Sequence, residues 1–185
     1  MFDKVLIANR GAIACRIERT LRRMGVASVA VYSAADVASL HVSAADEAIA
    51  LPGVRSEETY LNAELLLAAA RRTGARAIHP GYGFLAENAE FAAACAAQNV
   101  TFLGPRPDTM RSFALKHEAR RLALAQGLEM LPGTGLLADA DAALTQAAAI
   151  GYPVMLKSSA GGGGIGMLVC NGPDELAVAD RKSTR

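Results

Sequence analysis

The sequence has no tryptophan, few cysteines and no long apolar run. Its three cysteines (Cys15, Cys95 and Cys170) are far apart and form no C-x-x-C pair, so neither a disulfide framework nor a zinc site is indicated. The apolar runs end well short of the roughly 18 residues of a membrane span, and we expect no cleavable leader, because residues 4–8 continue directly into Asn9-Arg10-Gly11. A formal net charge of +1 gives no electrostatic reason to bind nucleic acid or an anionic membrane. We therefore expect a cytoplasmic protein that binds neither nucleic acid nor a membrane.

Lysine is also scarce, whereas apolar residues are plentiful. Hydrophobic types make up 52% of the 185 residues and charged types 20%, which is enough to build a packed core. The only lysines are Lys4, Lys116, Lys157 and Lys182. Where arginine is the common cation, a lysine is a candidate for a site that needs a compact point charge.

Short apolar strands alternate with helical periodicity in the first part of the chain. We expect strands near residues 4–8, 26–32, 47–51, 75–79 and 100–103, and helices near 13–24, 61–72 and 87–98. Ile13, Ile17, Leu21 and Met24 define one face of the first helix. This alternation is typical of crossover units and predicts an α/β fold with a parallel sheet.

The pattern changes beyond Pro107, and we place a domain boundary near residues 105–115. We expect helices over 109–126 and 138–150, separated by a loop at 132–135. Strands at 153–157 and 167–170 flank a run of glycines.

The glycine-rich segment from Lys157 to Met167 is the strongest local signal. Glycines let the backbone approach a ligand closely and point N–H groups at phosphate oxygens. A dinucleotide fingerprint must open a helix, and a Walker A loop needs Gly-Lys-Ser/Thr; neither follows here. The segment therefore predicts a hairpin lid over a triphosphate, with Lys157 at its base. The alternative is a flexible surface loop.

Three other features are candidate functional elements. Lys116 lies on an expected helix, where the alternative is a solvated lysine. The loops at residues 8–14 and 79–85 (His-Pro-Gly-Tyr-Gly-Phe-Leu) follow strands at the carboxyl edge of the sheet, where such sheets bind ligands. The alternative for the second loop is a tight turn in which Tyr82 and Phe84 pack. We predict that His41 and His117 are structural or exposed and that the Cys15 and Cys95 thiols are buried.

In order along the chain, these motifs closely resemble the amino-terminal part of the biotin carboxylase component of biotin-dependent carboxylases. The resemblance runs from about Phe2 to Ala179. The motifs are Leu6-Ile7-Ala8-Asn9-Arg10-Gly11, His79 to Leu85 with Glu87-Asn88, Phe102-Leu103-Gly104-Pro105, Lys116, Gly151-Tyr152-Pro153, Lys157 and the glycine segment. Three stretches resemble urea carboxylase more than the acyl-CoA-linked enzymes: the one with Ala12 and Cys15, Phe-Ala-Leu-Lys-His at 113–117, and the glycine segment with Ile165.

The resemblance implies a Rossmann-like preATP-grasp domain at residues 1–112 and an incomplete ATP-grasp domain at 113–179. It implies ATP, Mg²⁺ and biotin on a carrier domain, with phosphorylated bicarbonate as the source of the carboxyl group. A homodimer is implied as well. The implied ATP-binding residues are Lys116, Lys157, Gly163 and Gly164, and Tyr82 and Gly83 are candidates for the biotin and bicarbonate pocket.

The sequence departs from the family in two ways. The family's metal-binding carboxylates, general base and biotin-steadying arginine have no counterpart here, so we predict that this chain alone is inactive. Residues 180–185 look non-native and are expected to break a helix that begins after Leu176. The codons GAT CGG AAG AGC ACA CGT, the start of a common sequencing adapter, encode these six residues, so we hypothesise that the reading frame entered an adapter. The alternatives are a chance tail and a genuinely truncated gene.

Two alternative functions remain. The chain could belong to another ATP-grasp ligase, such as a carboxylate–amine ligase, although the loops at 6–11 and 79–85 would not be expected there. It could also act as a non-catalytic binding or dimerisation module through its Rossmann-like half.

Overall fold

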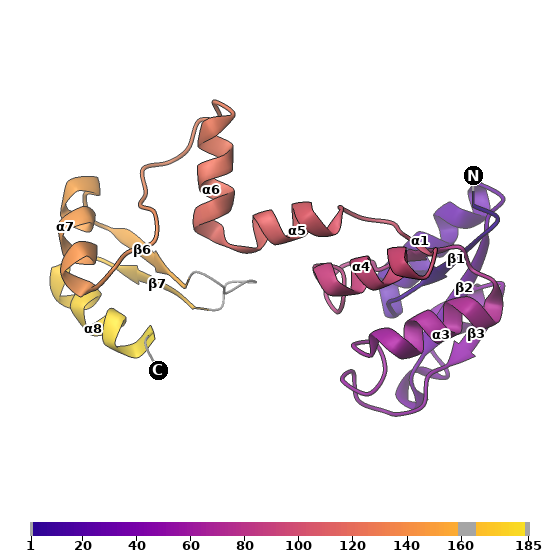
Figure 1. Ribbon diagram of the computed structural model, residues 1–185. Helices are drawn as coiled ribbons and strands as arrows, with labels where there is room; N and C mark the ends of the chain where they lie inside the picture. Colours follow the sequence, from indigo (N-terminus) through magenta and orange to yellow (C-terminus); the bar gives the residue numbers. More distant parts are fainter. Residues whose placement is uncertain (1, 159–165, 184–185) are drawn as a thin grey trace. The chain divides into compact units, whose positions relative to one another are not determined.

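A computed structural model describes residues 2–158 and 166–183 of the chain (Figure 1). The chain forms two compact units, Met1–Met110 and Arg111–Arg185, and each is described by itself. Within the described ranges, no helix combines the length and the apolar character needed to cross a bilayer.

The first unit is built on a five-stranded parallel sheet with the order β3-β2-β1-β4-β5. The strands are β1 (Lys4–Ile7), β2 (Ala27–Tyr32), β3 (Glu47–Ala50), β4 (Ala77–His79) and β5 (Thr101–Phe102). The parallel α/β sheet predicted from the sequence is confirmed, and each strand lies within the expected range.

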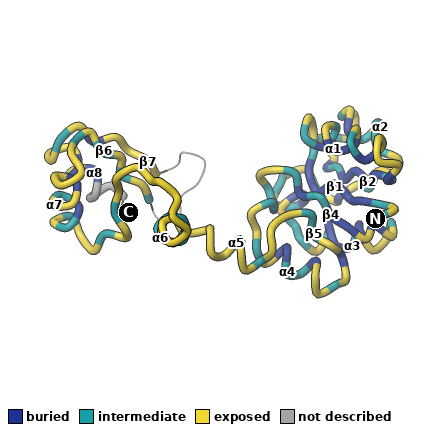
Figure 2. The backbone as a smooth tube through the Cα atoms, turned by 90° about the horizontal axis from the view of Figure 1, so that it is seen from above, coloured by how far each residue is buried: buried dark blue, intermediate teal, exposed yellow. Residues whose placement is uncertain are grey.

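Helices cover both faces of this sheet. They are α1 (Gly11–Arg23), α2 (Leu40–Ala44), α3 (Ala63–Thr73) and α4 (Ala89–Ala97), with a short 3-10 helix, η1 (Ala34–Asp36). Because strand side chains alternate, Val5 and Ile7 of β1 pack with α1, whereas Leu6 packs with α3 and α4. Buried residues follow the central strands β1, β2 and β4 (Figure 2).

The buried face of α1 differs from the expected one. Its buried residues are Ala14, Ile17, Glu18 and Leu21, whereas Met24 is 53% exposed and Ile13 is only partly buried. Glu18 therefore occupies a core position, and neither of its carboxylate oxygens has a hydrogen-bond partner among the described residues. Burial raises the pKa of Glu18 to about 7, and the nearby Asp46 carboxylate adds to this effect while Arg22 opposes it.

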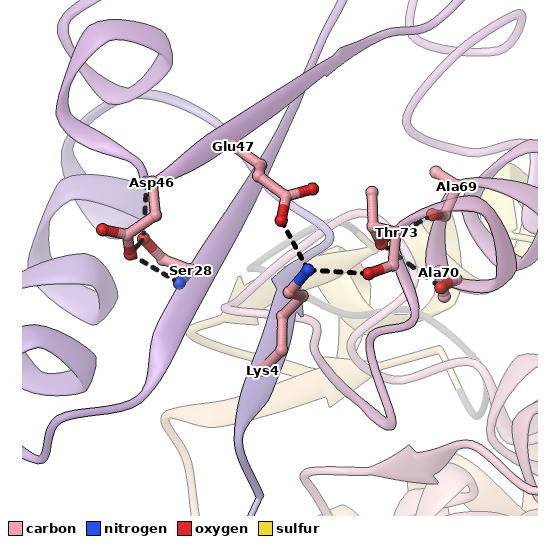
Figure 3. A network of polar contacts seen from close by, with 7 residues as sticks. All are labelled: Lys4, Ser28, Asp46, Glu47, Ala69, Ala70 and Thr73. Atoms are coloured by element: carbon pink, nitrogen blue, oxygen red, sulfur yellow. Dashed lines mark hydrogen bonds and ion pairs between the residues drawn. The ribbon is translucent and has the colours of Figure 1, made fainter.

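Polar contacts tie elements together at the amino edge of the sheet (Figure 3). The Lys4 ammonium donates to the Glu47 carboxylate and, at 2.8 Å, to the carbonyl oxygen of Thr73. The start of β1 is thereby connected to the start of β3 and to the end of α3. Beside them, Asp46 accepts hydrogen bonds from the backbone N–H and the hydroxyl of Ser28, both at 2.8 Å, which lower the pKa of Asp46.

The second unit contains a β-hairpin and helices. Its elements are α6 (Lys116–Ala125), α7 (Ala140–Ile150), β6 (Val154–Lys157), β7 (Met167–Cys170) and α8 (Pro173–Ser183); α5 (Pro107–Ala114) crosses the boundary between the units. β6 and β7 pair antiparallel, as the hairpin prediction requires. The buried cluster of this unit consists of Ala143, Ala147, Cys170, Leu176 and Ala179.

Three predictions of local structure are wrong. The single helix expected over 109–126 is divided at Leu115, which is extended (φ −98°, ψ 122°) and precedes Lys116 at the start of α6. The helix expected to break in the tail continues to Ser183, because neither glycine nor proline interrupts that stretch. The Cys15 thiol is only partly buried, unlike that of Cys95, because it lies at the margin of the buried stripe of α1.

Candidate functional site

Two loops that the sequence marks as ligand-binding candidates lie side by side at the carboxyl edge of the sheet. They follow β1 and β4, which are neighbouring strands. The backbone N–H of Ala8 donates to the carbonyl of His79 at 2.9 Å. The Asn9 side-chain amide then donates to the carbonyl oxygens of Pro80 and Tyr82, each at 2.8 Å. The first loop is thus fastened directly to the second.

The second loop has a left-handed backbone at three positions. These are Gly81 (φ +67°), Gly83 (φ +66°) and, unusually for a bulky residue, Phe84 (φ +41°). A Cβ at position 81 would lie 2.7 Å from Nδ2 of Asn9, so glycine is required there by both conformation and space. Gly83 has no neighbour within 4 Å of such a Cβ, so its conformation alone favours glycine.

The two aromatic residues of this loop behave differently. The Phe84 ring stacks on the Tyr60 ring, with centroids 5.1 Å apart and an interplanar angle of 14°. The Tyr82 side chain is instead directed to solvent, and the residue is 67% exposed. The packed-turn interpretation therefore holds for Phe84 and is wrong for Tyr82, which is available to a ligand.

The carboxylate of Asp36, the last residue of η1, contacts three neighbouring side chains. Asp36 accepts hydrogen bonds from Arg10 (3.0 Å), the Ser33 hydroxyl (2.8 Å) and the Tyr60 hydroxyl (2.7 Å). The Arg10 guanidinium also lies 5.3 Å from the centroid of the Tyr60 ring and 5.7 Å from that of Phe84. The sequence analysis did not identify Asp36 or Tyr60, since no motif connects them across 24 residues.

These contacts shift the pKa values of Asp36 and Tyr60 in this cluster of Arg10, Ser33, Asp36 and Tyr60. Burial by itself would raise the pKa of Asp36, but its three donors outweigh burial and hold that pKa below its usual value. Burial and the adjacent Asp36 carboxylate raise the pKa of Tyr60 to about 12. The cluster therefore contains an ionised carboxylate and a neutral phenol at neutral pH.

His79 helps to shape the same loop. Its Nδ1 accepts a hydrogen bond from the backbone N–H of Gly81 at 3.0 Å, which requires a ring nitrogen without a proton. Burial lowers the pKa of His79 and so favours this neutral form.

In the second unit, one predicted ATP-binding residue, Lys116, contacts the residue next to another, Lys157, at the base of the hairpin. Lys157 is the last residue of β6 and pairs with Met167 of β7. The next residue, Ser158, donates its backbone N–H to the carbonyl of Gly166 at 2.9 Å and closes the hairpin. The Lys116 ammonium donates to the Ser158 carbonyl at 3.1 Å. The break at Leu115 therefore starts a helix whose first side chain reaches the residue next to Lys157.

The other candidate residues lie in different parts of the chain. Gly163 and Gly164 lie outside the residues that the structure describes. Tyr82 and Gly83 belong to the first unit, whereas Lys116 and Lys157 belong to the second. His41 is buried with Nε2 3.3 Å from the carbonyl oxygen of Val31, which confirms a structural position. Within 2–158 and 166–183, no group of three or more His, Cys, Asp or Glu side chains is placed to hold a metal ion.

With this geometry described, comparison with known families identifies the class of protein. Residues 1–110 match the family model for the biotin carboxylase N-terminal domain. Residues 116–185 match the model for the ATP-binding domain of the carbamoyl-phosphate synthase L chain. The chain belongs to the biotin carboxylase family.

Several relatives have similar sequences. Biotin carboxylase 2 of Bacillus subtilis is 52% identical over 90% of this chain and 38% of its own length. The alpha subunit of methylcrotonoyl-CoA carboxylase from rice is 49% identical over 94% of the chain and 24% of its own length. Urea amidolyase of Saccharomyces cerevisiae is 47% identical over 95% of the chain and 10% of its own length.

Solved structures agree with the fold. A biotin carboxylase from Campylobacter jejuni, described as a complex with β,γ-ATP, superposes with a TM-score of 0.94 and 43% identity over 99% of this chain and 41% of that one. The biotin carboxylase domain dimer of Hydrogenobacter thermophilus 2-oxoglutarate carboxylase, described with MgADP and bicarbonate, gives a TM-score of 0.92 and 43% identity, covering 99% of this chain and 40% of that one.

These comparisons do not favour the urea type specifically. Relatives that carboxylate acyl-CoA esters by name are as similar to the chain as urea amidolyase is. The chain also spans only 10–38% of the length of the curated relatives described above.

Proposed function

We propose that the chain contributes the preATP-grasp domain and the beginning of the ATP-grasp domain of an ATP-dependent biotin carboxylase. The reaction would carboxylate biotin on a carrier domain, with ATP and bicarbonate as co-substrates. The observation that carries this proposal is the tandem order of the two family matches, residues 1–110 and then 116–185. The domain limits that we propose are 1–112 and 113–179, with 180–185 as a separate tail.

Lys116 and Lys157 are the proposed ATP-binding side chains. Both are compact cations at the closed base of the hairpin, and the Lys116 ammonium already donates to a backbone oxygen there. Positive groups fixed in advance where phosphoryl charge develops are the main protein contribution to phosphoryl transfer. Gly163 and Gly164, between the two hairpin strands in sequence, are proposed to supply backbone N–H groups.

Mg²⁺ would neutralise charge on the nucleotide phosphates when bound. Among the described residues, the cations Lys116 and Lys157 suit the negatively charged ATP phosphates, but no residue is assigned as a ligand of the metal. The relative from H. thermophilus is described with MgADP and bicarbonate, which supports the same co-substrates here.

Tyr82 and Gly83 are the proposed contacts for biotin and bicarbonate. The support is the exposed Tyr82 ring on a loop fixed at the carboxyl edge of the sheet, where open α/β sheets bind their ligands. We propose a homodimer as the assembly, since the H. thermophilus relative is described as a dimer.

Within the family, we propose the urea carboxylase type. The support is Ala12, Cys15 and Ile165 in their motifs, together with the similarity to urea amidolyase. The second candidate is an acyl-CoA carboxylase, which the similarity to methylcrotonoyl-CoA carboxylase supports. Comparison of urea with short acyl-CoA esters as final carboxyl acceptors distinguishes the two.

Carboxylation of free biotin from labelled bicarbonate, by the protein as its native gene encodes it, tests the proposal. We expect ATP-dependent labelling that falls about 100-fold or more in Lys157→Ala and in Lys116→Ala. Arg121→Ala is the matched control, because Arg121 is an exposed cation on α6 that pairs with Glu118. Labelling that needs no ATP, or that survives both lysine substitutions, would contradict the proposal.

A further inference from the structure

Tyr82 combines an exposed side chain with a fixed backbone. Its side chain is 67% exposed, yet its carbonyl oxygen is held by the Asn9 amide at 2.8 Å. Two residues later, Phe84 adopts a left-handed conformation that a bulky side chain rarely takes. The loop is therefore anchored on both sides of a side chain that itself packs little.

Asn9 forms the first anchor, and its side chain uses its full donor capacity. The two Nδ2 hydrogens go to the carbonyl oxygens of Pro80 and Tyr82, and Oδ1 accepts the backbone N–H of Arg10 at 2.9 Å. The residue is only 3% exposed, so water cannot readily replace these bonds. Aspartate, which has the same shape but no donor in its ionised form, would place a charge against two carbonyl oxygens.

The second anchor holds the Phe84 ring. The ring lies against Tyr60 and under the Arg10 guanidinium, and the carboxylate of Asp36 fixes both of these neighbours. A strained backbone conformation persists only where several surrounding contacts hold it in place. Such conformations are concentrated at ligand-binding and active sites.

We propose that Asn9, Arg10, Asp36 and Tyr60, here called the loop clamp, are positioning residues that hold Tyr82 ready for the biotin ring. This inference rests on the function proposed above for Tyr82. A loop whose backbone is already fixed loses less conformational freedom when a ligand binds to its side chain. The loop clamp acts through Tyr82 and does not touch the reacting atoms.

A double-mutant cycle tests the proposal in the protein encoded by the native gene. The Michaelis constants for free biotin and for ATP are measured for Asn9→Asp, Tyr82→Ala and the double variant. We expect Asn9→Asp to raise the biotin KM about tenfold while the ATP KM changes less than about twofold. In the Tyr82→Ala background, Asn9→Asp should change the biotin KM by less than about twofold, because a positioning residue has nothing left to position.

Two further variants separate positioning from folding. Asn62→Asp is the matched control, because Asn62 accepts the backbone N–H of Leu65 at the start of α3 and aspartate can do the same. Tyr60→Phe keeps the ring that stacks on Phe84 and removes the hydroxyl, which donates to Asp36 and accepts the backbone N–H of Ser33 at 2.9 Å. It should still fold and show a smaller rise in biotin KM.

The fluorine resonance of 3-fluorotyrosine at Tyr82 gives a second readout that needs no turnover. It is assigned with Tyr82→Phe, and we expect Asn9→Asp to shift and broaden it while Asn62→Asp leaves it unchanged.

The outcomes are distinguishable. If Tyr82→Ala leaves the biotin KM unchanged, or the wild type carboxylates no biotin, the proposed function of Tyr82 fails and the fluorine resonance alone decides on the loop clamp. If Tyr82→Ala raises the biotin KM but the effects of Asn9→Asp and Tyr82→Ala are additive, the loop clamp is only structural and the positioning proposal is overturned. An unchanged fluorine resonance in Asn9→Asp would overturn it as well.

Discussion

The two units support their candidate residues in different ways. In the first, apolar clusters on both faces of a parallel sheet support the loops that carry Tyr82 and Gly83. In the second, the buried cluster contains three alanines, Cys170 and Leu176, while Met155, Met167, Leu168 and Val169 of the hairpin are 41–51% exposed. We therefore expect the stability of the first unit to depend more on its core than that of the second. Figure 2 shows the same contrast in the share of buried residues.

Truncation of one leucine in each unit should sharpen this contrast most. Leu66 on α3 is fully buried, whereas Leu168 on β7 is 50% exposed. We expect Leu66→Ala to lower the free energy of unfolding by about 2–5 kcal/mol, because it leaves a cavity. Leu168→Ala should lower it by about 1 kcal/mol or less. Urea denaturation measures both, and equal losses would show that the second unit has a comparable core.

The buried carboxyl of Glu18 should make the first unit sensitive to pH. Burial raises its pKa from an unfolded value near 4.5 to about 7 in the fold. The protonated form thus stabilises the fold fully below pH 4.5, and this contribution is lost as the pH rises through 7.

Glu18→Gln removes this titration. Relative to wild type, we expect the variant to gain about 2–3 kcal/mol in free energy of unfolding between pH 5 and pH 8. The exposed Glu57→Gln is the control for the loss of a surface carboxyl group. Parallel stability curves for Glu18→Gln and wild type would show that Glu18 is not buried.

Closure of the hairpin should depend on Gly166. This residue has φ +71°, and a Cβ there would lie 2.6 Å from Oγ of Ser158. We expect Gly166→Ala to destabilise the second unit by about 1–2 kcal/mol and to speed hydrogen exchange of the Ser158 amide, with little effect in the first unit. Gly135→Ala is the control, since nothing lies within 4 Å of its Cβ position. Equal exchange rates in the two variants would contradict a tight closure.

The smallest expected effect concerns the cap of α7. The Asp139 carboxylate accepts the backbone N–H of Ala142 at 2.8 Å. Asp139→Ala should lower the free energy of unfolding of the second unit by about 1 kcal/mol, whereas Asp139→Asn should retain the cap. Thermal unfolding followed by circular dichroism compares the two variants, and identical midpoints would show that the cap contributes nothing.

Local patterns predicted much of the fold. Alternating apolar runs located the five parallel strands. Gly74 ends α3 in the left-handed conformation that favours glycine at a helix C-terminus. The hairpin was predictable because apolar runs flank the glycines on both sides. The resemblance of the ordered motifs predicted the biotin carboxylase family, and the comparisons confirm that prediction.

Contacts between distant residues were not predictable. No glycine or proline in the sequence marks the helix break at Leu115. The break allows Lys116 to contact Ser158, and because these residues are 42 positions apart, local patterns could not predict it. Asp36 and Tyr60 belong to no motif, so their place beside the Tyr82 loop emerges only when the strands are assembled. Glu18 was overlooked because a carboxylate is not expected in the buried stripe of a helix.

Bicarbonate-dependent release of ADP from ATP tests the central claim most directly. It is measured for the protein encoded by the native gene, in wild type and Lys157→Ala, and for the purified 185-residue chain. The account predicts ADP release that requires bicarbonate, falls about 100-fold in Lys157→Ala, and is absent from the 185-residue chain alone. ADP release that ignores bicarbonate, or that is unchanged in Lys157→Ala, would contradict it.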